Sequence, residues 1–420
     1  MSRRPAGPTH VEAQELADIL TWRHRWSRIW RVVLPASTIV GILALTALLY
    51  NVSNQSFGYI AVENEVDPQS LAIAGVPLGE LPKSRLVAIL QDNISEGLYR
   101  RLEHDQPFDQ RSREDVLDLV HERVVNPEVV ASWTLHESLL ARDRIEADMA
   151  RQFPAAQLEF RSWVDLDFLR SQQSPNPQIT GVRPAILGSL WTILITIAFA
   201  FPIGVGAAIY LEEYADDNRL NRLIQTNINN LAGVPSIIYG ILGLAVFVRA
   251  LEPITSGTAF GLADPTTANG RTILSAGMTL ALLILPLIII NAQEAIRAVP
   301  GSLRQASYGL GGTKWQTIWS HVLPNALPGI LTGTILAVSR AIGETAPLVV
   351  VGASTFIAID PSSPFSKFTT LPIQIFQWTA RPQNVFRNTA AAAIIVLLVL
   401  LLTLNASAIL LRNRFSSRSN

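Results

Sequence analysis

Two side chains of opposite charge lie inside a long apolar run. Arg340 and Glu344 are four residues apart between Ala326 and Gly352, and Thr345 adds a hydroxyl directly after them. A helix rises about 1.5 Å per residue, so Arg340 would lie about 21 Å along a helix that starts at Ala326, well inside a bilayer core of about 30 Å. Residues four apart project from one helix face. The spacing therefore predicts a charged pair within a membrane.

The pair has two interpretations. An ionised residue near the bilayer centre costs about 2.5–3.5 kcal/mol even on lenient insertion scales, so it normally faces a protein interior or a water-filled path. A guanidinium offers forked donors that suit an oxyanion, which makes Arg340, Glu344 and Thr345 candidates for a substrate path. Gly343 would keep that surface open, and Pro347 would free a carbonyl one turn earlier. The alternative is a self-neutralising ion pair that locks the helix to its neighbours.

The composition requires a membrane around these residues. Of the 420 residues, 49% are hydrophobic and 16% are charged, and the 33 basic residues balance the 33 acidic ones. Zero net charge gives no general attraction to nucleic acid. The absence of cysteine excludes disulfides, thiolate metal sites and thiol nucleophiles. The six histidines are scattered without metal-ligand spacing, so we expect no metal site.

Six apolar stretches are long enough to cross a bilayer as helices. They cover residues 32–50, 184–211, 229–251, 272–292, 326–352 and 389–411. The first stretch is too long for a cleavable signal and lacks a cleavage site, so we interpret it as a retained anchor. In the arm before it, residues 1–31, Trp22, Trp26 and Trp30 share one helical face, which predicts an interfacial helix in the headgroup layer. A partner-docking helix is the alternative.

Basic residues near the spans predict the orientation of the chain. The arm before Val32 carries Arg23, Arg25, Arg28 and Arg31. Six spans then place this arm, loops 212–228 and 293–325, and the tail 412–420 on the cytoplasmic side, where these segments carry further Arg and Lys. We therefore expect a multi-pass protein of the cytoplasmic (inner) membrane with both termini in the cytoplasm.

Residues 51–183 lack a membrane-length apolar run and are rich in charged residues and Gln. The segment is long enough for a domain. Residues 84–96, 111–123 and 138–152 have roughly helical spacing of apolar positions. We predict a folded, mainly helical extracytoplasmic insertion between the first two spans, and a loosely structured spacer is the alternative.

Loop 293–325 predicts two short helical pieces, around 301–310 and 314–322, broken at Gly311 and Gly312. Glycine takes positive φ readily and lets a chain turn sharply between helices. Such a helical hairpin could fit a groove on a soluble partner.

The residues of this loop resemble a known motif. Gln305-Ala306-Ser307, Gly311 and Leu323-Pro324 have the complete spacing of the EAA loop of permease subunits of ABC importers. Gln305 replaces the usual Glu, Ser307 the second Ala and His321 the usual Ile. The ion pair expected from the Glu would therefore become a neutral hydrogen bond.

Three further segments narrow the resemblance to the A-type permease of the phosphate-specific (Pst) ABC importer. They are AIYLEEYA at 208–215, LAGVPSIIYG at 231–240 and RAIGETAPL at 340–348. The likeness covers residues from about Pro184 onward and says nothing of the insertion. It implies an all-α membrane protein with six transmembrane helices, in which residues 184–411 form the five-helix core of a type I, MetI-like importer permease.

The resemblance also implies function and partners. It implies import of inorganic phosphate, with Gln305, Ala306, Ser307, Gly311, Leu323 and Pro324 coupling to an ATPase. The implied partners are an ATP-binding subunit dimer, a second homologous permease subunit and an extracytoplasmic phosphate-binding protein. The apolar spans themselves predict contact with membrane lipid. Within the pathway, Glu344 could accept a hydrogen bond from protonated phosphate, whereas sulfate has no such proton at neutral pH.

This chain has no G-x-x-x-x-G-K-[ST] loop, so we expect it to bind no ATP or other cofactor and to be a transporter subunit without enzymatic activity. Ser339 beside Arg340 is weak support for an intramembrane protease, because serine in a span usually serves helix packing. Two alternatives remain. One is a permease for another oxyanion, molybdate or sulfate. The other is a non-transporting scaffold or sensor, for which Gln305 is the only support.

Overall fold

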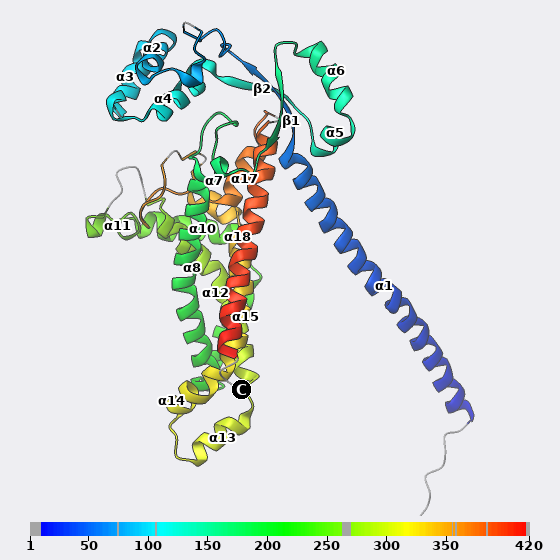
Figure 1. Cartoon of the computed structure of the whole chain (residues 1–420). Helices are drawn as coiled ribbons and strands as arrows, with labels where there is room; N and C mark the ends of the chain where they lie inside the picture. Colours follow the sequence, from blue (N-terminus) through cyan, green and yellow to red (C-terminus); the bar gives the residue numbers. More distant parts are fainter. Residues whose placement is uncertain are drawn as a thin grey trace, which may run out of the picture. The chain divides into compact units, whose positions relative to one another are not determined.

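The computed structural model describes residues 10–73, 75–105, 107–262, 270–354, 356–357, 359–383 and 385–416 (Figure 1). These residues are mostly helical. The chain forms two compact units, residues 1–54 and 55–420.

The described residues of the first unit lie in one long helix. Helix α1 runs without interruption from His10 to Ser56, over 47 residues. The rings of Trp22 and Trp26 lie 5.8 Å apart, as residues four apart on a helix should. The interfacial helix predicted before Val32 stays a prediction; in the described residues, the helix that carries the tryptophans continues directly into the apolar stretch. In lipid a helix satisfies its own backbone groups, which favours its continuation. Residues 1–9 of the predicted arm lie outside the described residues.

Long apolar helices form the core of the second unit. They are α8 (Arg183–Ile209), α12 (Ile273–Arg297), α15 (Leu323–Gly343) and α18 (Val385–Ser416). Together with α1 they give five described helices that are long and apolar enough to span a membrane, or six spans if a bent pair counts as one. The six-span prediction agrees with this second count.

The bent pair replaces the straight span predicted at residues 229–251. Helix α9 (Arg219–Ala232) and the helix formed by α10 (Ser236–Gly243) and the π-helix η5 (Leu244–Ala250) meet at 106°. Gly233 is the C-cap of α9, and Pro235 precedes α10 with φ −54° and ψ 136°. Proline disfavours helical geometry at the residue before it, which ends α9. Helix α9 also occupies much of the predicted loop 212–228.

The fifth predicted span is also interrupted. Helix α15 ends at Gly343, and the short helix α16 (Ala346–Val351) follows. Glu344 has φ −76° and ψ 122°, which is extended backbone. The prediction of one helix through residue 352 is therefore wrong. Pro347 lies in the first turn of α16, where a missing N–H breaks no helical bond, so it does not free a carbonyl in α15.

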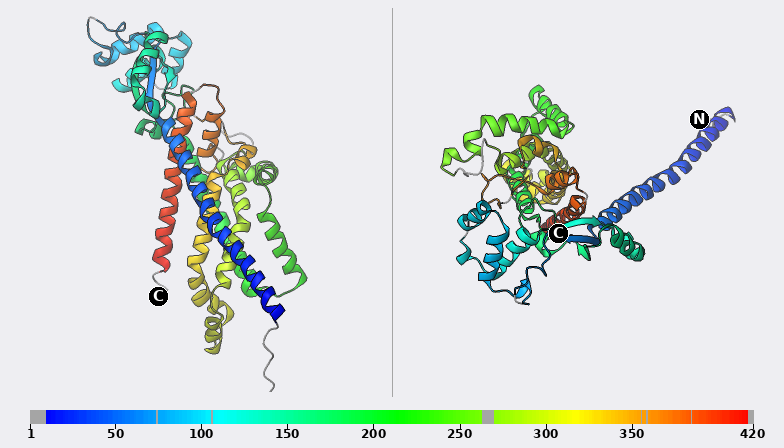
Figure 2. Two further views of the ribbon diagram at one scale, coloured as in Figure 1. Left: turned by 90° about the vertical axis from the view of Figure 1, so that its right-hand side faces the viewer. Right: turned by 90° about the horizontal axis from the view of Figure 1, so that it is seen from above.

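Helix α12 packs against both α8 and α15, and α15 also packs against α18 (Figures 1 and 2). Small residues permit this close approach. A Cβ on Gly333 of α15 would lie 2.3 Å from the Asn291 Cβ of α12, and a Cβ on Gly277 of α12 would lie 2.5 Å from Ile195 of α8. Because lipid tails are as apolar as leucine, such close packing is a main source of helix association in a membrane.

The insertion after α1 is folded and mainly helical, and it adds a small sheet that the sequence analysis missed. Strands β1 (Phe57–Asn64), β2 (Pro127–Ser132) and β3 (Gln157–Ser162) form an antiparallel sheet in the order β2-β1-β3. The helices are α2 (Lys83–Asn93), α3 (Glu96–Asp105), α4 (Arg113–Val120), α5 (Leu135–Leu140), α6 (Arg142–Gln152) and α7 (Leu166–Arg170). Short helical turns η1 (Leu78–Glu80), η2 (Phe108–Gln110) and η3 (His121–Val125) connect them.

Two apolar clusters hold the insertion together. One lies among α2, α3 and α4 and is centred on Leu86, Leu90 and Val116, all fully buried. The other joins Ile60 of β1 to Trp378 and Phe386, which lie on α17 (Leu371–Thr379) and α18. This burial contradicts the loose-spacer alternative. The insertion lies at the end of the helical core opposite the C-terminal end of α18 (Figure 1).

The remaining elements lie in the connections. They are α11 (Glu252–Thr255), η6 (Thr258–Phe260), η4 (Tyr210–Tyr214), α13 (Gly301–Gly309), α14 (Lys314–Thr317) and η7 (Ile318–Val322).

Candidate functional site

The predicted charged pair lies at the break between α15 and α16. Arg340 is in the last turn of α15, and Glu344 is its C-cap residue. The Arg340 Nε lies 3.3 Å from the Glu344 Oε1. The two side chains therefore contact each other at the end of α15 and not within the continuous helix that was predicted.

The pair is open to the surface of this subunit. The Arg340 side chain is 46% exposed and that of Glu344 18% exposed. On α15, Ala337 and Ala341 face the buried core, whereas Leu336, Arg340 and Gly343 are exposed. A Cβ on Gly343 would meet nothing within 4 Å, which agrees with the predicted open surface. Within the described residues, the hydrogen bond of Arg340 goes to Glu344 on the same segment and joins no second span.

The segment 231–240, which the sequence analysis also singled out, packs against the segment that contains the break. Helix α16 packs on α10, where a Cβ on Gly240 would lie 2.6 Å from the Cα of Pro347. The Tyr239 hydroxyl donates a hydrogen bond of 2.8 Å to the Leu231 carbonyl and so ties α10 back to α9. Segments 231–240 and 340–348 are thus in contact, and half-buried Thr345 is the N-cap residue of α16.

The loop 293–325 forms the predicted helical hairpin. Helix α13 is followed by a turn at Gly311, which has φ +83°, and then by α14 and η7. The Gly312 amide donates to the Ser307 carbonyl at 3.0 Å, and the Ser307 and Thr317 hydroxyls lie 2.7 Å apart. Thr313 and Gln316 form a capping box that starts α14. The hairpin is therefore closed by specific contacts and not by chain connectivity alone.

The predicted coupling residues differ in how deeply they are buried. Gln305, Ala306 and Gly311 are exposed, and Ser307 is buried in the hairpin. Leu323 and Pro324 begin α15, so the hairpin leads directly into the helix that carries Arg340. The hairpin also presents apolar side chains that the sequence analysis did not single out: Leu310 is 91% exposed, and the exposed rings of Trp315 and Trp319 stack 5.6 Å apart.

The sequence analysis also missed two acidic residues that form ion pairs beside the hairpin. Glu213 binds Arg304 of α13 at 2.7 Å, and Glu212 binds Arg297 at the end of α12. Both acids belong to segment 208–215, which had drawn attention only through its family resemblance. The sequence signal was two consecutive acids after an apolar run, with arginines in a later loop. Glu213 and Arg304 are 91 residues apart in the sequence, and Glu212 and Arg297 are 85 residues apart.

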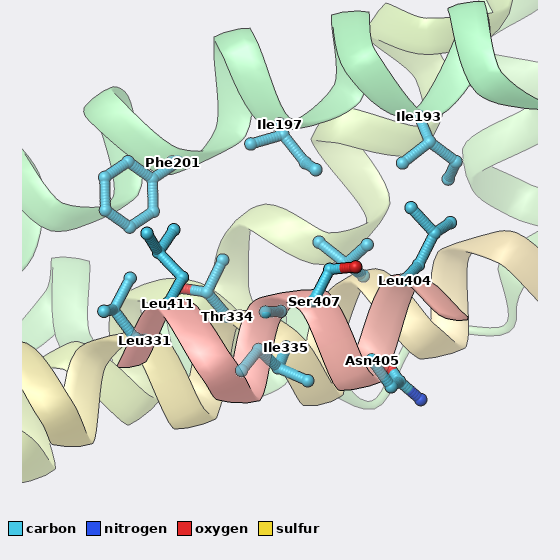
Figure 3. Close-up of a pocket in the computed structure, with 12 residues that line it drawn as sticks. Ile193, Ile197, Phe201, Leu331, Thr334, Ile335, Leu404, Asn405, Ser407 and Leu411 are labelled. Atoms are coloured by element: carbon cyan, nitrogen blue, oxygen red, sulfur yellow. The ribbon is translucent and has the colours of Figure 1, made fainter. Parts of the chain in front are cut away.

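An apolar groove of about 400 Å³ lies among α8, α15 and α18 (Figure 3). Ile193, Ile197, Leu331 and Leu404 line it, and its polar groups are neutral ones such as those of Thr334 and Ser407. No charged side chain is among its described lining residues, so the groove does not suit an oxyanion.

Comparison with known proteins places both the break and the hairpin in a matched region. The family described as "Binding-protein-dependent transport system inner membrane component" matches residues 200–419. The probable ABC transporter permease protein YqgI of Bacillus subtilis (strain 168) is 31% identical over 218 residues, 51% of this chain and 68% of that protein. The phosphate transport system permease protein PstA 1 of Mycobacterium tuberculosis (strain CDC 1551 / Oshkosh) is 34% identical over 233 residues, 55% of this chain and 70% of that protein.

Among solved structures, an inward-facing form of the MetNI methionine ABC transporter matches with a TM-score of 0.42 and 18% identity, over 55% of this chain and 96% of that one. The family match extends over half of the sequence and includes the interrupted helix and the hairpin. The chain therefore belongs to the family of inner-membrane components of binding-protein-dependent transport systems.

Proposed function

We propose that this chain is a permease subunit of an ATP-driven ABC importer that moves inorganic phosphate across the cytoplasmic membrane. The observation that carries the proposal is the open Arg340–Glu344 pair at the break between α15 and α16. The 34% identity to a phosphate transport system permease protein supports phosphate as the anion.

The exposure of Arg340 supports a path at the subunit surface. A guanidinium at membrane depth is costly against lipid, so an exposed face that carries one calls for a water-filled path or a partner. A second homologous permease subunit facing Leu336, Arg340 and Gly343 would enclose such a path. Arg340 would bind the phosphate oxygens, and Glu344 would accept a hydrogen bond from a protonated oxygen. Thr345 would add a hydroxyl at the start of α16.

The surface and position of the hairpin support the proposal of the remaining partners. A dimer of ATP-binding subunits would receive α13 and α14, whose exposed Leu310, Trp315 and Trp319 offer an apolar docking surface. An extracytoplasmic phosphate-binding protein would dock at the opposite end of the core. The hairpin and the C-terminal end of α18 lie at the same end (Figure 1). Together with the basic arm, this arrangement supports the proposal of a cytoplasmic hairpin and cytoplasmic termini.

Uptake of labelled phosphate by the assembled complex tests the proposal. Arg340→Gln removes the charge-assisted hydrogen bonds to the anion, which are worth about 1.5–3 kcal/mol, so uptake should fall about tenfold or more. Leu402→Gln is the control, because Leu402 is exposed on α18 and is not on the face of α15 that carries Arg340. This variant should keep its uptake. Co-purification of the ATPase subunit shows that each complex is assembled.

A double variant separates the anion path from a purely structural ion pair. If the pair only neutralises itself, Arg340→Gln with Glu344→Gln should restore uptake, because no charge is left unpaired. If Arg340 binds the anion, the double variant should remain inactive. Normal uptake by Arg340→Gln in an assembled complex would refute the proposal. Stimulation of ATP hydrolysis by molybdate or sulfate, and not by phosphate, would identify the other oxyanions.

A further inference from the structure

The inner end of α8 widens into a π-helical turn before it reaches the hairpin. In η4 (Tyr210–Tyr214) the Ala215 amide donates to the Tyr210 carbonyl at 2.8 Å, five residues back. Such turns are rare and occur often at functional sites. This turn directs two consecutive acids toward the same loop: Glu212 meets Arg297, and Glu213 meets Arg304.

Arg304 joins three segments through one guanidinium. Its Nε and Nη2 donate to the Glu213 Oε1 at 3.0 and 2.7 Å. Its Nη1 donates to the Val299 carbonyl at 2.8 Å, and Nη2 also donates to the Ile296 carbonyl at 3.0 Å. The side chains of Arg304 and Glu213 are 20% and 7% exposed. Helix α13, the end of α12 and the end of α8 are therefore fixed to one rigid, planar group.

The neighbouring pair offers a contrast. The Arg297 side chain is 69% exposed, although it also binds an acid of the same π turn. Exposed ion pairs contribute little because water and salt screen them. A further contact reinforces the buried pair, because the Lys314 Nζ lies 5.1 Å from the centre of the Tyr214 ring. The hairpin thus touches the π turn through both α13 and α14.

We infer that the Glu213–Arg304 pair is a clamp that transmits movement of the hairpin to α8 during transport. The inference rests on the proposed function. Without the clamp, the connection between α12 and α13 at residues 298–300 would act as a hinge, and a partner could displace α13 without moving α8. With it, α13 and the inner end of α8 move as one body. Glu213 and Arg304 are positioning residues, since they lie at the hairpin, on η4 and α13, and not at the break with Arg340.

The first test measures phosphate uptake per ATP hydrolysed in the complete reconstituted complex with its binding protein. Glu213→Gln and Arg304→Gln should each lower this ratio at least fivefold while the ATPase subunit still co-purifies. Arg304→Lys keeps the charge but loses the fork, so it should recover part of the ratio. Arg297→Gln is the matched control and should leave the ratio unchanged. An unchanged ratio in Glu213→Gln would overturn the clamp.

A second test does not depend on the substrate. The chain contains no cysteine, so Asp216→Cys and Ser302→Cys place one spin label beside η4 and one on α13. In the complex, the distance between the labels should be the same with and without trapped ATP, and it should change on ATP binding once Glu213→Gln is added. A distance that changes equally with the native Glu213 would refute the clamp. Absence of phosphate uptake by the unaltered complex would instead refute the proposed function and leave this distance measurement valid.

Discussion

Replacing Gly311 with valine should uncouple ATP hydrolysis from transport. Gly311 has φ +83° at the turn between α13 and α14, and a Cβ there would meet nothing within 4 Å. The penalty is therefore conformational and not steric contact with a neighbour. A left-handed conformation costs an L-residue about 1–2 kcal/mol, and a β-branched side chain is among the least tolerant. That range lowers the population of the native turn, relative to other turn conformations, by a factor of about 5–30.

The hydrogen bonds that close the turn determine the expected result. The Gly311 amide donates to Tyr308 and the Gly312 amide to Ser307, both at 3.0 Å, and these bonds set the angle between α13 and α14. In the reconstituted complex, phosphate uptake per ATP should fall severalfold in Gly311→Val, with ATP hydrolysis retained.

Two controls isolate the backbone conformation as the cause. Gly309→Val changes a helical glycine that also has open space around it, so it should behave nearly as the native chain. Gly311→Asn should retain most of the coupling, because asparagine tolerates the left-handed region better than other non-glycine residues. Equal coupling in Gly311→Val and Gly309→Val would refute the reasoning.

Two further predictions concern stability. Gly240→Ala places a Cβ 2.6 Å from the Pro347 backbone, so overpacking of about 1–3 kcal/mol should lower the thermal midpoint of the purified protein. Gly206→Ala is the control and should not lower the midpoint, because its Cβ would meet nothing within 4 Å. Equal midpoints for the two variants would contradict the close α10–α16 contact. Thr134→Ala removes the hydroxyl that caps α5 and should speed hydrogen exchange in α5 about fivefold at neutral pH, from a cap worth about 1 kcal/mol. Hydrogen bonds from the Thr134 amide and hydroxyl lower the pKa of Glu137 below its usual value. The stabilisation by this carboxylate is therefore complete above the unfolded pKa of about 4.3 and is lost as pH falls through the lower folded pKa. The difference in hydrogen-exchange rate between the native chain and Thr134→Ala should therefore narrow as pH falls through that folded pKa. A difference in rate that does not depend on pH would refute this role of Glu137.

Patterns within short stretches of sequence were sufficient for much of the membrane core. Four of the six apolar runs correspond to helices α1, α8, α12 and α18, because a span needs only length and apolarity to be recognised. The hairpin was also predictable, since Gly311 and Gly312 separate two helical patterns. Glu344 and Thr345 carry no comparable signal in an apolar run, so the break between α15 and α16 escaped sequence reasoning.

The sheet of the insertion escaped for a similar reason. Strand β1 follows α1 without an intervening residue, and its partners β2 and β3 lie far along the chain. Strand pairing depends on such distant partners, whereas helical periodicity is local. The three helical stretches predicted in the insertion therefore correspond to α2, α4 and α6, whereas the strands that connect it to Trp378 and Phe386 were not predicted.

The sequence by itself determined that this chain crosses a membrane, that Arg340 and Glu344 lie in one apolar stretch, and that a glycine-centred hairpin precedes their helix. Only the tertiary structure decided that the pair is exposed at a helix break, that α16 leans on Gly240, and that Glu213 holds Arg304. Apolarity and helical spacing are properties of neighbouring residues. Exposure and partner choice depend on how segments dozens of residues apart pack against one another.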